Sequence, residues 1–404
     1  MSNSALEVKR WAFAGLLLVV FAQFSAQAQL VVTNNNASGA GSLQEAILNA
    51  ADGETIYFDR SLNGASISNF FVNQNTNKTI TIDAYNLSNS ITLIGSGASY
   101  VLGVNAGTMI LKNIAISAPN ASASTIGDIG GISLTGNLEM YDCELVNIGN
   151  EAPDDGPTLA GGIWVEDGSS LIVRNSAFIN IHGSSTAVIY NAGNVNLGNV
   201  TIHDFDTDTD GAGQAIFIED IVGSGIFNHV TIFTGTGKAI NNDFAGGPFQ
   251  LNFCLIDETF DTGGENLLQG DFEGDRNYIG DTPSGWTLAG SGNLQFDQQD
   301  DFPASISNIG GLTPVCPISA GHPAIDLATG SSSQVDARGY RRTGVPDAGA
   351  HESSSSLPTI FYVDVSAADG GEGTTWGSPY STLQEALIRS NNLTQIWVAA
   401  GNYI

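Results

Sequence analysis

Apolar and polar residues recur in a six-residue pattern through the middle of the chain, with an apolar residue at the first and sixth positions and a mostly polar third position. Successive copies begin 24–33 residues apart, at Leu111–Ile116, Met140–Leu145, Val173–Phe178, Leu197–Ile202, Phe227–Ile232 and Leu251–Ile256. Two or three short strands per repeat, separated by Gly, Asn and Asp, predict stacked coils. Such irregular spacing would misalign propeller blades but suits a parallel β-helix, whose turns can bulge outward.

The third residue of each copy is predicted to lie in a turn. Asn tolerates left-handed backbone angles, and stacked Asn side chains can hydrogen-bond along the solenoid axis. A polar row that binds a ligand is the alternative interpretation. We assign a structural role to the four Asn and Asp residues at this position, Asn113, Asp142, Asn175 and Asn199. Lys112 and Arg174, each one residue before a turn, are interpreted as solvent-facing.

Two segments share a helix-opening pattern that predicts the ends of solenoids. Ser42 with Glu45, and Thr382 with Glu385, form capping boxes ahead of short amphipathic helices that lead into strands. The first helix would cover the open end of the coils, and the second would open another solenoid. The predicted organisation is a signal peptide (1–28), β-helix coils with an N-terminal cap (29–260), an insertion and closing segment (261–352), a linker (353–358) and the start of a second, incomplete β-helix (359–404).

Residues 1–28 have the layout of a secretory signal peptide. Lys9 and Arg10 precede an apolar run over residues 11–24, and small residues then lead to a cleavage site near Ala28. A membrane anchor is the alternative, but this run is shorter than the roughly 20 residues that span a bilayer. We therefore expect a protein that is secreted or held at the outer cell surface, with no transmembrane segment in the mature chain.

Composition narrows the classes of partner. Only 13% of the residues are charged, and the formal net charge of −29 disfavours nucleic acid and anionic membranes. The apolar fraction of 42% argues against disorder. Three cysteines make neither a disulfide framework nor a zinc site, and Cys143 and Cys254 are interpreted as buried core residues. We expect a monomer.

Several acidic residues are candidates for chemistry. In the closing segment Asp336, Arg338, Arg341, Asp347 and Glu352 are interpreted as structural, because a sheet end needs hydrogen-bonded cover and a forked Arg between carboxylates provides it.

A separate acidic loop resembles the first half of an EF-hand. Asp206, Asp208 and Asp210 alternate ahead of Gly211, which is the spacing of oxygen ligands around Ca²⁺. Position twelve is Phe217 instead of Glu, so a solvated acidic loop is the alternative. We expect Ca²⁺ here and no other cofactor.

The sequence gives little evidence for a catalytic site. Between residues 100 and 260 the strong bases are Lys112, Arg174 and Lys238, and the five histidines are scattered. No Ser-His-Asp set or carboxylate pair can be argued from spacing, so no catalytic residue is assigned.

The segment 32–47 resembles the helical start of polymorphic-outer-membrane-type repeat proteins. Residues 291–294, 321–326, 336–339 and 347–352 resemble the closing segment called a choice-of-anchor Q domain, and residues 361–365, 375–376 and 397–401 resemble the opening of another β-helix. The resemblance implies a secreted bacterial protein, all-β, with a right-handed parallel β-helix. Members often end in a sorting domain, and none follows here, so either the sequence is truncated or attachment works otherwise.

Two functions follow as hypotheses. The first is a non-catalytic, adhesin-like secreted or cell-surface module that binds glycans or other surface components. The alternative is a carbohydrate-active β-helix enzyme, either a polysaccharide lyase or a glycoside hydrolase. A face with clustered carboxylates and a Lys or Arg within about 4 Å would favour the enzyme.

Overall fold

The computed structural model describes most of the chain after residue 28. The described residues are 29–96, 100–119, 130–149, 161–183, 185–207, 213–219, 224–235, 237–243, 248–257, 267–280, 288–295 and 305–403.

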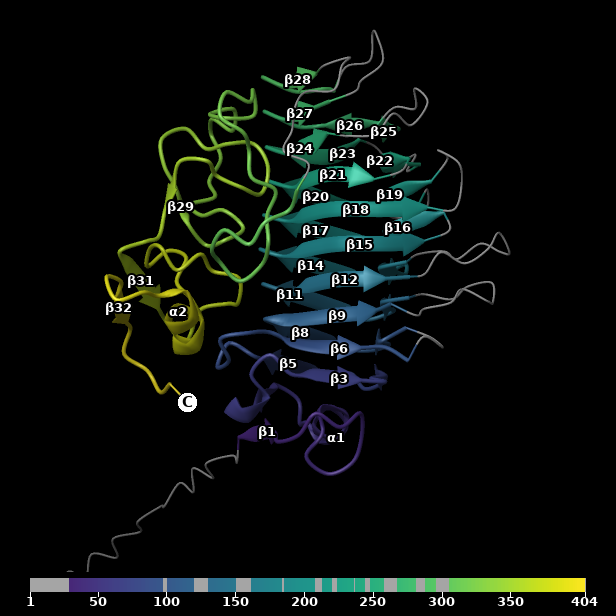
Figure 1. Cartoon of the computed structure of the whole chain (residues 1–404), viewed down its shortest axis with the longest axis vertical. Helices are drawn as coiled ribbons and strands as arrows, with labels where there is room; N and C mark the ends of the chain where they lie inside the picture. The colour runs from purple at the N-terminus through teal and green to yellow at the C-terminus, as the bar shows by residue number, and fades with distance from the viewer. Residues whose placement is uncertain are drawn as a thin grey trace, which may run out of the picture.

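Three parallel β-sheets run side by side along a solenoid, and each full coil contributes one strand to each sheet (Figure 1). Sheet 1 contains β1 (Leu30–Val32), β2 (Glu54–Phe58), β5 (Thr79–Asp83), β8 (Thr108–Lys112), β11 (Asn137–Tyr141), β14 (Ser170–Arg174), β17 (Asn194–Gly198), β20 (Ser224–Asn228), β23 (Phe249–Asn252) and β26 (Phe272–Glu273). Sheet 2 contains β3 (Ser66–Ser68), β6 (Ile91–Ile94), β9 (Ile114–Ala118), β12 (Glu144–Ile148), β15 (Ala177–Gly183), β18 (Thr201–Thr207), β21 (Thr231–Gly235), β24 (Leu255–Asp257), β27 (Tyr278–Ile279) and β28 (Leu294–Gln295). Sheet 3 contains β4 (Val72–Gln74), β7 (Leu102–Val104), β10 (Ile132–Leu134), β13 (Ile163–Val165), β16 (Thr186–Asn191), β19 (Gln214–Ile218), β22 (Lys238–Asn242) and β25 (Leu268–Gln269).

The repeated pattern stacks in register and forms the core. The first residue of every six-residue copy pairs with its counterpart in the next coil and is fully buried: Leu111, Met140, Val173, Leu197, Phe227 and Leu251. Each coil buries these side chains only against its neighbours, so the coils stabilise one another. The all-β parallel β-helix predicted from the sequence is confirmed, and its strands continue beyond residue 260 to β28.

The turn between sheets 1 and 2 has the same left-handed backbone in coil after coil. Its seven residues have φ between 51° and 58°: Asn113, Asp142, Asn175, Asn199, His229, Phe253 and Arg276. We call this row the turn ladder. Each turn is tied to the next, as when the N–H of Asn113 donates to the carbonyl of Tyr141 at 3.0 Å. One pair of amides also bonds along the axis, from Asn199 Nδ2 to Asn175 Oδ1 at 3.2 Å.

Helix α1 (Leu43–Asn49) covers the first coil. The hydroxyl of Ser42 accepts from the N–H of Glu45 at 3.2 Å, and the Glu45 carboxylate accepts from the N–H of Gly41 at 2.7 Å. Leu43 and Ile47 are buried against the end of the core, and a 3₁₀ turn, η1 (Arg60–Leu62), follows β2. Both described α-helices have only seven residues, and neither is long and apolar enough to cross a bilayer.

The chain then returns along the flank that carries the turn ladder (Figure 1). Residues 305–352, the closing segment, are mostly irregular; their β29 (Arg341–Arg342) pairs antiparallel with β30 (Ser355–Ser356) in the expected linker. Residues 359–403, the C-terminal unit, contain β31 (Ile360–Val363), α2 (Leu383–Arg389) and β32 (Gln395–Val398). Because β31 pairs parallel with β32, this unit repeats the order of β1, α1 and β2.

Buried charges attach the C-terminal unit to sheet 1. Arg389 of α2 donates to the carboxylate of Asp142 in the turn ladder, which also accepts from the hydroxyl of Tyr85. Lys112 Nζ lies 2.5 Å from the carboxylate of Asp369. Lys112 is only 3% exposed, so its interpretation as a solvent-facing residue is wrong: the position does face outward from the sheet, but the C-terminal unit covers it.

The turn conformation gives a stability prediction. Asn113→Ala is expected to be about 1 kcal/mol less stable than Asn113→Gly, because both remove the amide that donates to the Ala84 carbonyl but only Ala places a Cβ in the left-handed region. Urea denaturation of the two variants measures the difference. Equal midpoints would contradict the account.

The buried ion pair gives a second prediction. Asp142→Asn preserves the turn, since Asn occupies this position in three other coils, but it removes the closer of the two carboxylates that face the buried Arg389 and leaves Glu385 at 4.0 Å. We expect a loss of about 3–5 kcal/mol in the attachment of α2, seen as faster hydrogen exchange in residues 383–389 while the strands of sheet 1 stay protected. Asn175→Asp, the reverse exchange at a half-buried turn, is the control. Unchanged exchange in α2 would show that the ion pair does not hold the unit.

Candidate functional site

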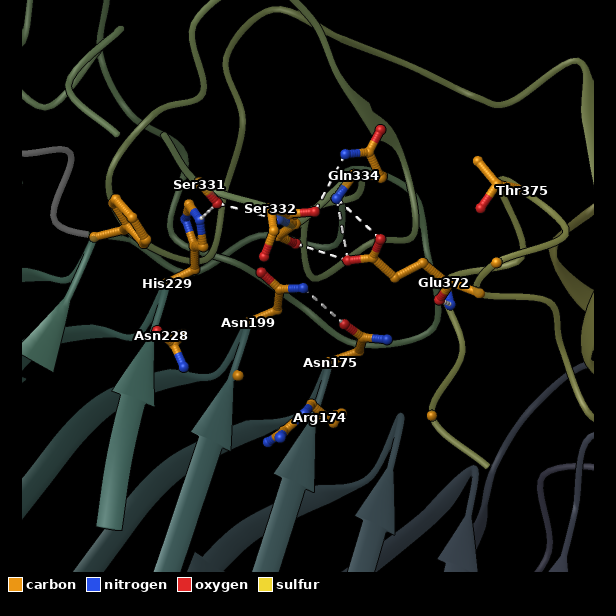
Figure 2. Close-up of a pocket in the computed structure, with 16 residues that line it drawn as sticks. Arg174, Asn175, Asn199, Asn228, His229, Ser331, Ser332, Gln334, Glu372 and Thr375 are labelled. Carbon is orange, nitrogen blue, oxygen red and sulfur yellow. Dashed lines mark hydrogen bonds between the residues drawn. The ribbon is translucent and has the colours of Figure 1, made fainter. Parts of the chain in front are cut away.

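A polar pocket of about 770 Å³ lies between the turn ladder, the closing segment and the C-terminal unit (Figure 2). We call it the flank pocket. Its sheet-1 side and turns contribute Arg174, Asn175, Gly198, Asn199, Asn228, His229 and Phe253. Residues 331–334 and the stretch containing Gly370, Glu372, Thr375, Gly377 and Ser378 supply the other walls. Three segments that are distant in the sequence therefore build one site.

The turn ladder determines which side chains enter the pocket. At Asn175, Asn199, His229 and Phe253 the left-handed backbone turns the chain from sheet 1 toward sheet 2, so the side chains of successive coils form a row along this edge. His229 stacks on Phe253 with ring centroids 5.1 Å apart and planes 23° apart. The first two positions supply amides and the last two supply rings, so the row changes from polar to aromatic along the pocket.

Arg174 gives this part of the pocket its positive charge. Its Nη1 donates to the carbonyls of Val173 and Asn196, both at 2.9 Å. The next residue in its row is Gly198, where an added Cβ would lie 2.9 Å from Arg174 Cδ. A glycine is therefore needed here for the guanidinium to lie across the neighbouring coil.

Glu372 connects the C-terminal unit to residues 331–334. Its carboxylate accepts from the Ser333 hydroxyl at 2.9 Å and from the N–H of Gln334 at 3.0 Å. Burial raises the pKa of Glu372 above its ordinary value, and these hydrogen bonds oppose the shift. Among the described residues that line the flank pocket it is the one carboxylate, so the walls are chiefly amides, hydroxyls and backbone.

His229 is buried and held from both ring nitrogens. Nδ1 lies 3.3 Å from the carbonyl oxygen of Gly349, and Nε2 lies 2.6 Å from the hydroxyl of Ser331. Burial, followed by the nearby guanidinium of Arg342, lowers the pKa of His229 well below its ordinary value. The ring is therefore neutral across the physiological pH range.

A second pocket of about 320 Å³ lies over the earlier coils. Asp83, Lys112 and Asp369 line it, and the hydroxyl of Ser381 donates to Asp369. Burial alone would lower the pKa of Lys112, but the carboxylates of Asp369, Glu385 and Asp83 raise it. This pocket therefore holds a lysine that stays protonated.

Four of the five closing-segment residues assigned a structural role, Asp336, Arg338, Asp347 and Glu352, form a buried network with Arg342. Arg338 donates from Nε and Nη2 to the carboxylate of Asp336, at 2.9 and 2.5 Å. Arg342 Nη1 lies 3.2 Å from Glu352 Oε2, which also accepts from the N–H of Asp347. The side chains of this network are all buried: Asp336, Arg338, Arg342, Asp347 and Glu352.

The prediction that Arg341 belongs to this network is wrong. Arg341 has an exposed side chain, whereas Arg342 is the buried arginine and reaches Asn199 in the turn ladder at 3.1 Å. Two adjacent arginines on a short strand point to opposite faces, and the sequence does not show which face is covered.

The proposed Ca²⁺ loop is described only at its beginning. Asp206 accepts from the N–H of Thr207 at 2.9 Å and lies 3.4 Å from Nδ1 of His182. Asp208 and Asp210 lie outside the described residues. Within the part of the chain that the structure describes, no three His, Cys, Asp or Glu side chains gather as a metal-binding group.

The flank pocket was not predicted from the sequence. The repeat did mark His229 as a turn residue, but Ser331 and Glu372 carry no local signal, since Ser331 lies 102 residues from His229. What brings them together is the return of the chain along the flank.

Comparisons with known proteins give a likeness in structure and none in sequence family. No protein-family model matches the chain, and no curated protein matches it. Among solved structures, the crystal structure of pectate lyase Pel9A is similar, with a TM-score of 0.46, 14% identity, and 80% of this chain and 96% of that chain covered. The three-sheet strand ladder establishes the fold independently of this likeness.

The raised pKa of Glu372 predicts a pH dependence. Because protonation is favoured in the folded state, its contribution to stability is full below the ordinary value of 4.5 and is lost as pH rises through the folded pKa. The wild-type chain should therefore lose stability relative to Glu372→Gln as pH rises above 4.5.

Asp364→Asn is the control for this titration, because hydrogen bonds from Ser366 lower the pKa of Asp364 from 3.8. Its effect on stability has the opposite sign and occurs at lower pH. The wild type should gain stability relative to Asp364→Asn as pH rises toward 3.8. Melting temperatures between pH 3 and 7 (roughly the window set by ordinary carboxyl values) measure both. A Glu372→Gln difference that is flat with pH would contradict the assignment.

Proposed function

We propose that the chain is a glycan-binding β-helix module that leaves glycosidic bonds intact. The observation that carries this proposal is the composition of the flank pocket, whose described walls combine planar amides, hydroxyls, one guanidinium and the Phe253 ring with a single carboxylate. Sugars present closely spaced hydroxyls that both donate and accept hydrogen bonds, and side-chain amides match them in both roles.

Size and charge favour the same ligand class. A pocket of about 770 Å³ is within the range of small-molecule sites and is large enough for a short oligosaccharide. The net charge of −29 would repel a polyanion, so a neutral or sparsely charged glycan is the better partner. Arg174 then donates hydrogen bonds to sugar oxygens without having to neutralise a polymer.

The proposal extends to where the protein acts. The predicted signal peptide, the choice-of-anchor Q-like closing segment and the resemblance to polymorphic-outer-membrane-type repeats all support an adhesin-like role at the outer cell surface or in the medium. Ca²⁺ bound through Asp206, Asp208 and Asp210 would add a stabilised bulge between coils. The proposed module acts as a monomer.

A carbohydrate-active enzyme is the second candidate, because Lys112, Asp83 and Asp369 combine a base with carboxylates beside the smaller pocket. A lyase needs a neutral base to remove a proton, and the carboxylates around Lys112 raise its pKa instead. Incubation with neutral and uronate polysaccharides, with and without Ca²⁺, distinguishes the candidates. New reducing ends, or the absorbance of unsaturated sugars, would show that the chain cleaves glycans and would favour the enzyme over the binding module.

A glycan array probed with the full chain tests the leading proposal. Arg174→Gln should lower the affinity for a glycan detected on the array about tenfold or more, since a hydrogen bond from a charged group contributes about 1.5–3 kcal/mol. Arg60→Gln, at an exposed arginine on the first coils, is the matched control and should bind as the wild type does. If no glycan binds, or if both variants bind alike, the flank pocket is not the site.

A further inference from the structure

The flank pocket contains a serine and a histidine in the arrangement of a nucleophile and its base. Ser331 Oγ lies 2.6 Å from His229 Nε2 (Figure 2). Gly330, at φ +94°, turns the chain sharply just before Ser331, which is half-buried at the pocket wall. His229 is 1% exposed and also lines the pocket, so its imidazole meets the Ser331 hydroxyl at the pocket wall.

The backbone fixes the tautomer of this histidine. The Gly349 carbonyl can only accept, so the neutral ring carries its proton on Nδ1 and presents the Nε2 lone pair to the Ser331 hydroxyl. Gly349 has φ +91°, and an added Cβ would lie 2.6 Å from Thr231 Oγ1 and 2.8 Å from Leu255 Cβ. Glycine is therefore required for the closing segment to approach the coils closely enough to orient His229.

We propose that Ser331 and His229 perform acyl transfer on esters, with Gly349 as the orienting group. The proposal goes beyond glycan binding, and its substrate class is a small acyl ester of a polyol, such as an O-acylated sugar. It concerns ester bonds alone, so the glycosidic bonds of a bound glycan stay intact.

The reaction balances with water as the only co-reactant. Ser331 Oγ adds to the ester carbonyl carbon while its proton passes to His229 Nε2. The bond from that carbon to the alcohol oxygen breaks, and the alcohol leaves with the proton from Nε2, so the acyl group remains on Ser331. Water then adds to the acyl carbon as Nε2 takes its proton. The bond to Ser331 Oγ breaks, the proton returns to Oγ, and the carboxylic acid departs.

The chain supplies an unusually clean variant for the test. His229 occupies a turn-ladder position that is Asn in three other coils, so His229→Asn keeps the left-handed turn and removes the base, together with its stack on Phe253 and its contact with Gly349. Ser331→Ala removes the nucleophile. Ser68→Ala, at an exposed serine of β3 outside the flank pocket, is the control.

The experiment treats the full chain with a fluorophosphonate, which transfers phosphorus to an activated serine with loss of fluoride, and locates the adduct by mass spectrometry. We expect one adduct on Ser331, no adduct in Ser331→Ala, wild-type labelling in Ser68→Ala, and labelling slowed about 100-fold or more in His229→Asn. Hydrolysis of p-nitrophenyl acetate should follow the same order.

Melting temperatures establish that the variants are folded. An unlabelled Ser331 in the folded wild type, or equal labelling rates in wild type and a folded His229→Asn, would overturn the proposal and leave the hydrogen bond as a contact that only anchors the loop. If His229→Asn does not fold, the labelling of the wild type compared with that of Ser331→Ala decides whether Ser331 is the nucleophile. The fluorophosphonate needs no sugar, so its labelling is independent of glycan binding. Ser331 can therefore be labelled even if no glycan binds on the array.

Discussion

The left-handed turn after each strand of sheet 1 is the constraint on which the rest of this structure depends. Seven residues with φ between 51° and 58° place the same bend in seven successive coils, and the backbone N–H at each bend donates to the coil above it. A bend at any other residue would shift the register and turn apolar side chains outward. The stacked core and the straight flank beside the turn ladder both follow from it.

That flank is the surface to which the last hundred residues attach. The closing segment reaches the turn ladder through Arg342 and Gly349, and the C-terminal unit reaches it through Arg389. Burying a guanidinium is costly unless it is paired with an opposite charge. Arg342 has the Glu352 carboxylate and the Asp347 carbonyl as partners, and Arg389 has the Asp142 carboxylate. The flank pocket is the space left between the two attached segments, and its residues are held by those same contacts.

Local periodicity explains how far the sequence could be interpreted. The β-helix, the left-handed turns and the buried first position of each repeat all depend on contacts within a coil and with the next coil along the chain, and a repeated pattern shows such contacts directly. Lys112 was misplaced because its position does face outward, and only the return of the chain covers it. Arg342, Glu372 and Ser331 were missed because their partners are distant in the sequence. Arg342 and Ser331 contact turns of the coils, and Glu372 contacts the closing segment.

The central claim is that this flank, and no open sheet face, is where a ligand binds. Hydrogen–deuterium exchange of the full chain, with and without a glycan selected on an array, tests it most directly. The account predicts slower exchange in residues 331–334 and 370–378 and at the turn that contains His229, with the strands of sheet 3 unchanged. Protection confined to the outer face of sheet 3, or no protection at the flank under saturating glycan, would contradict it.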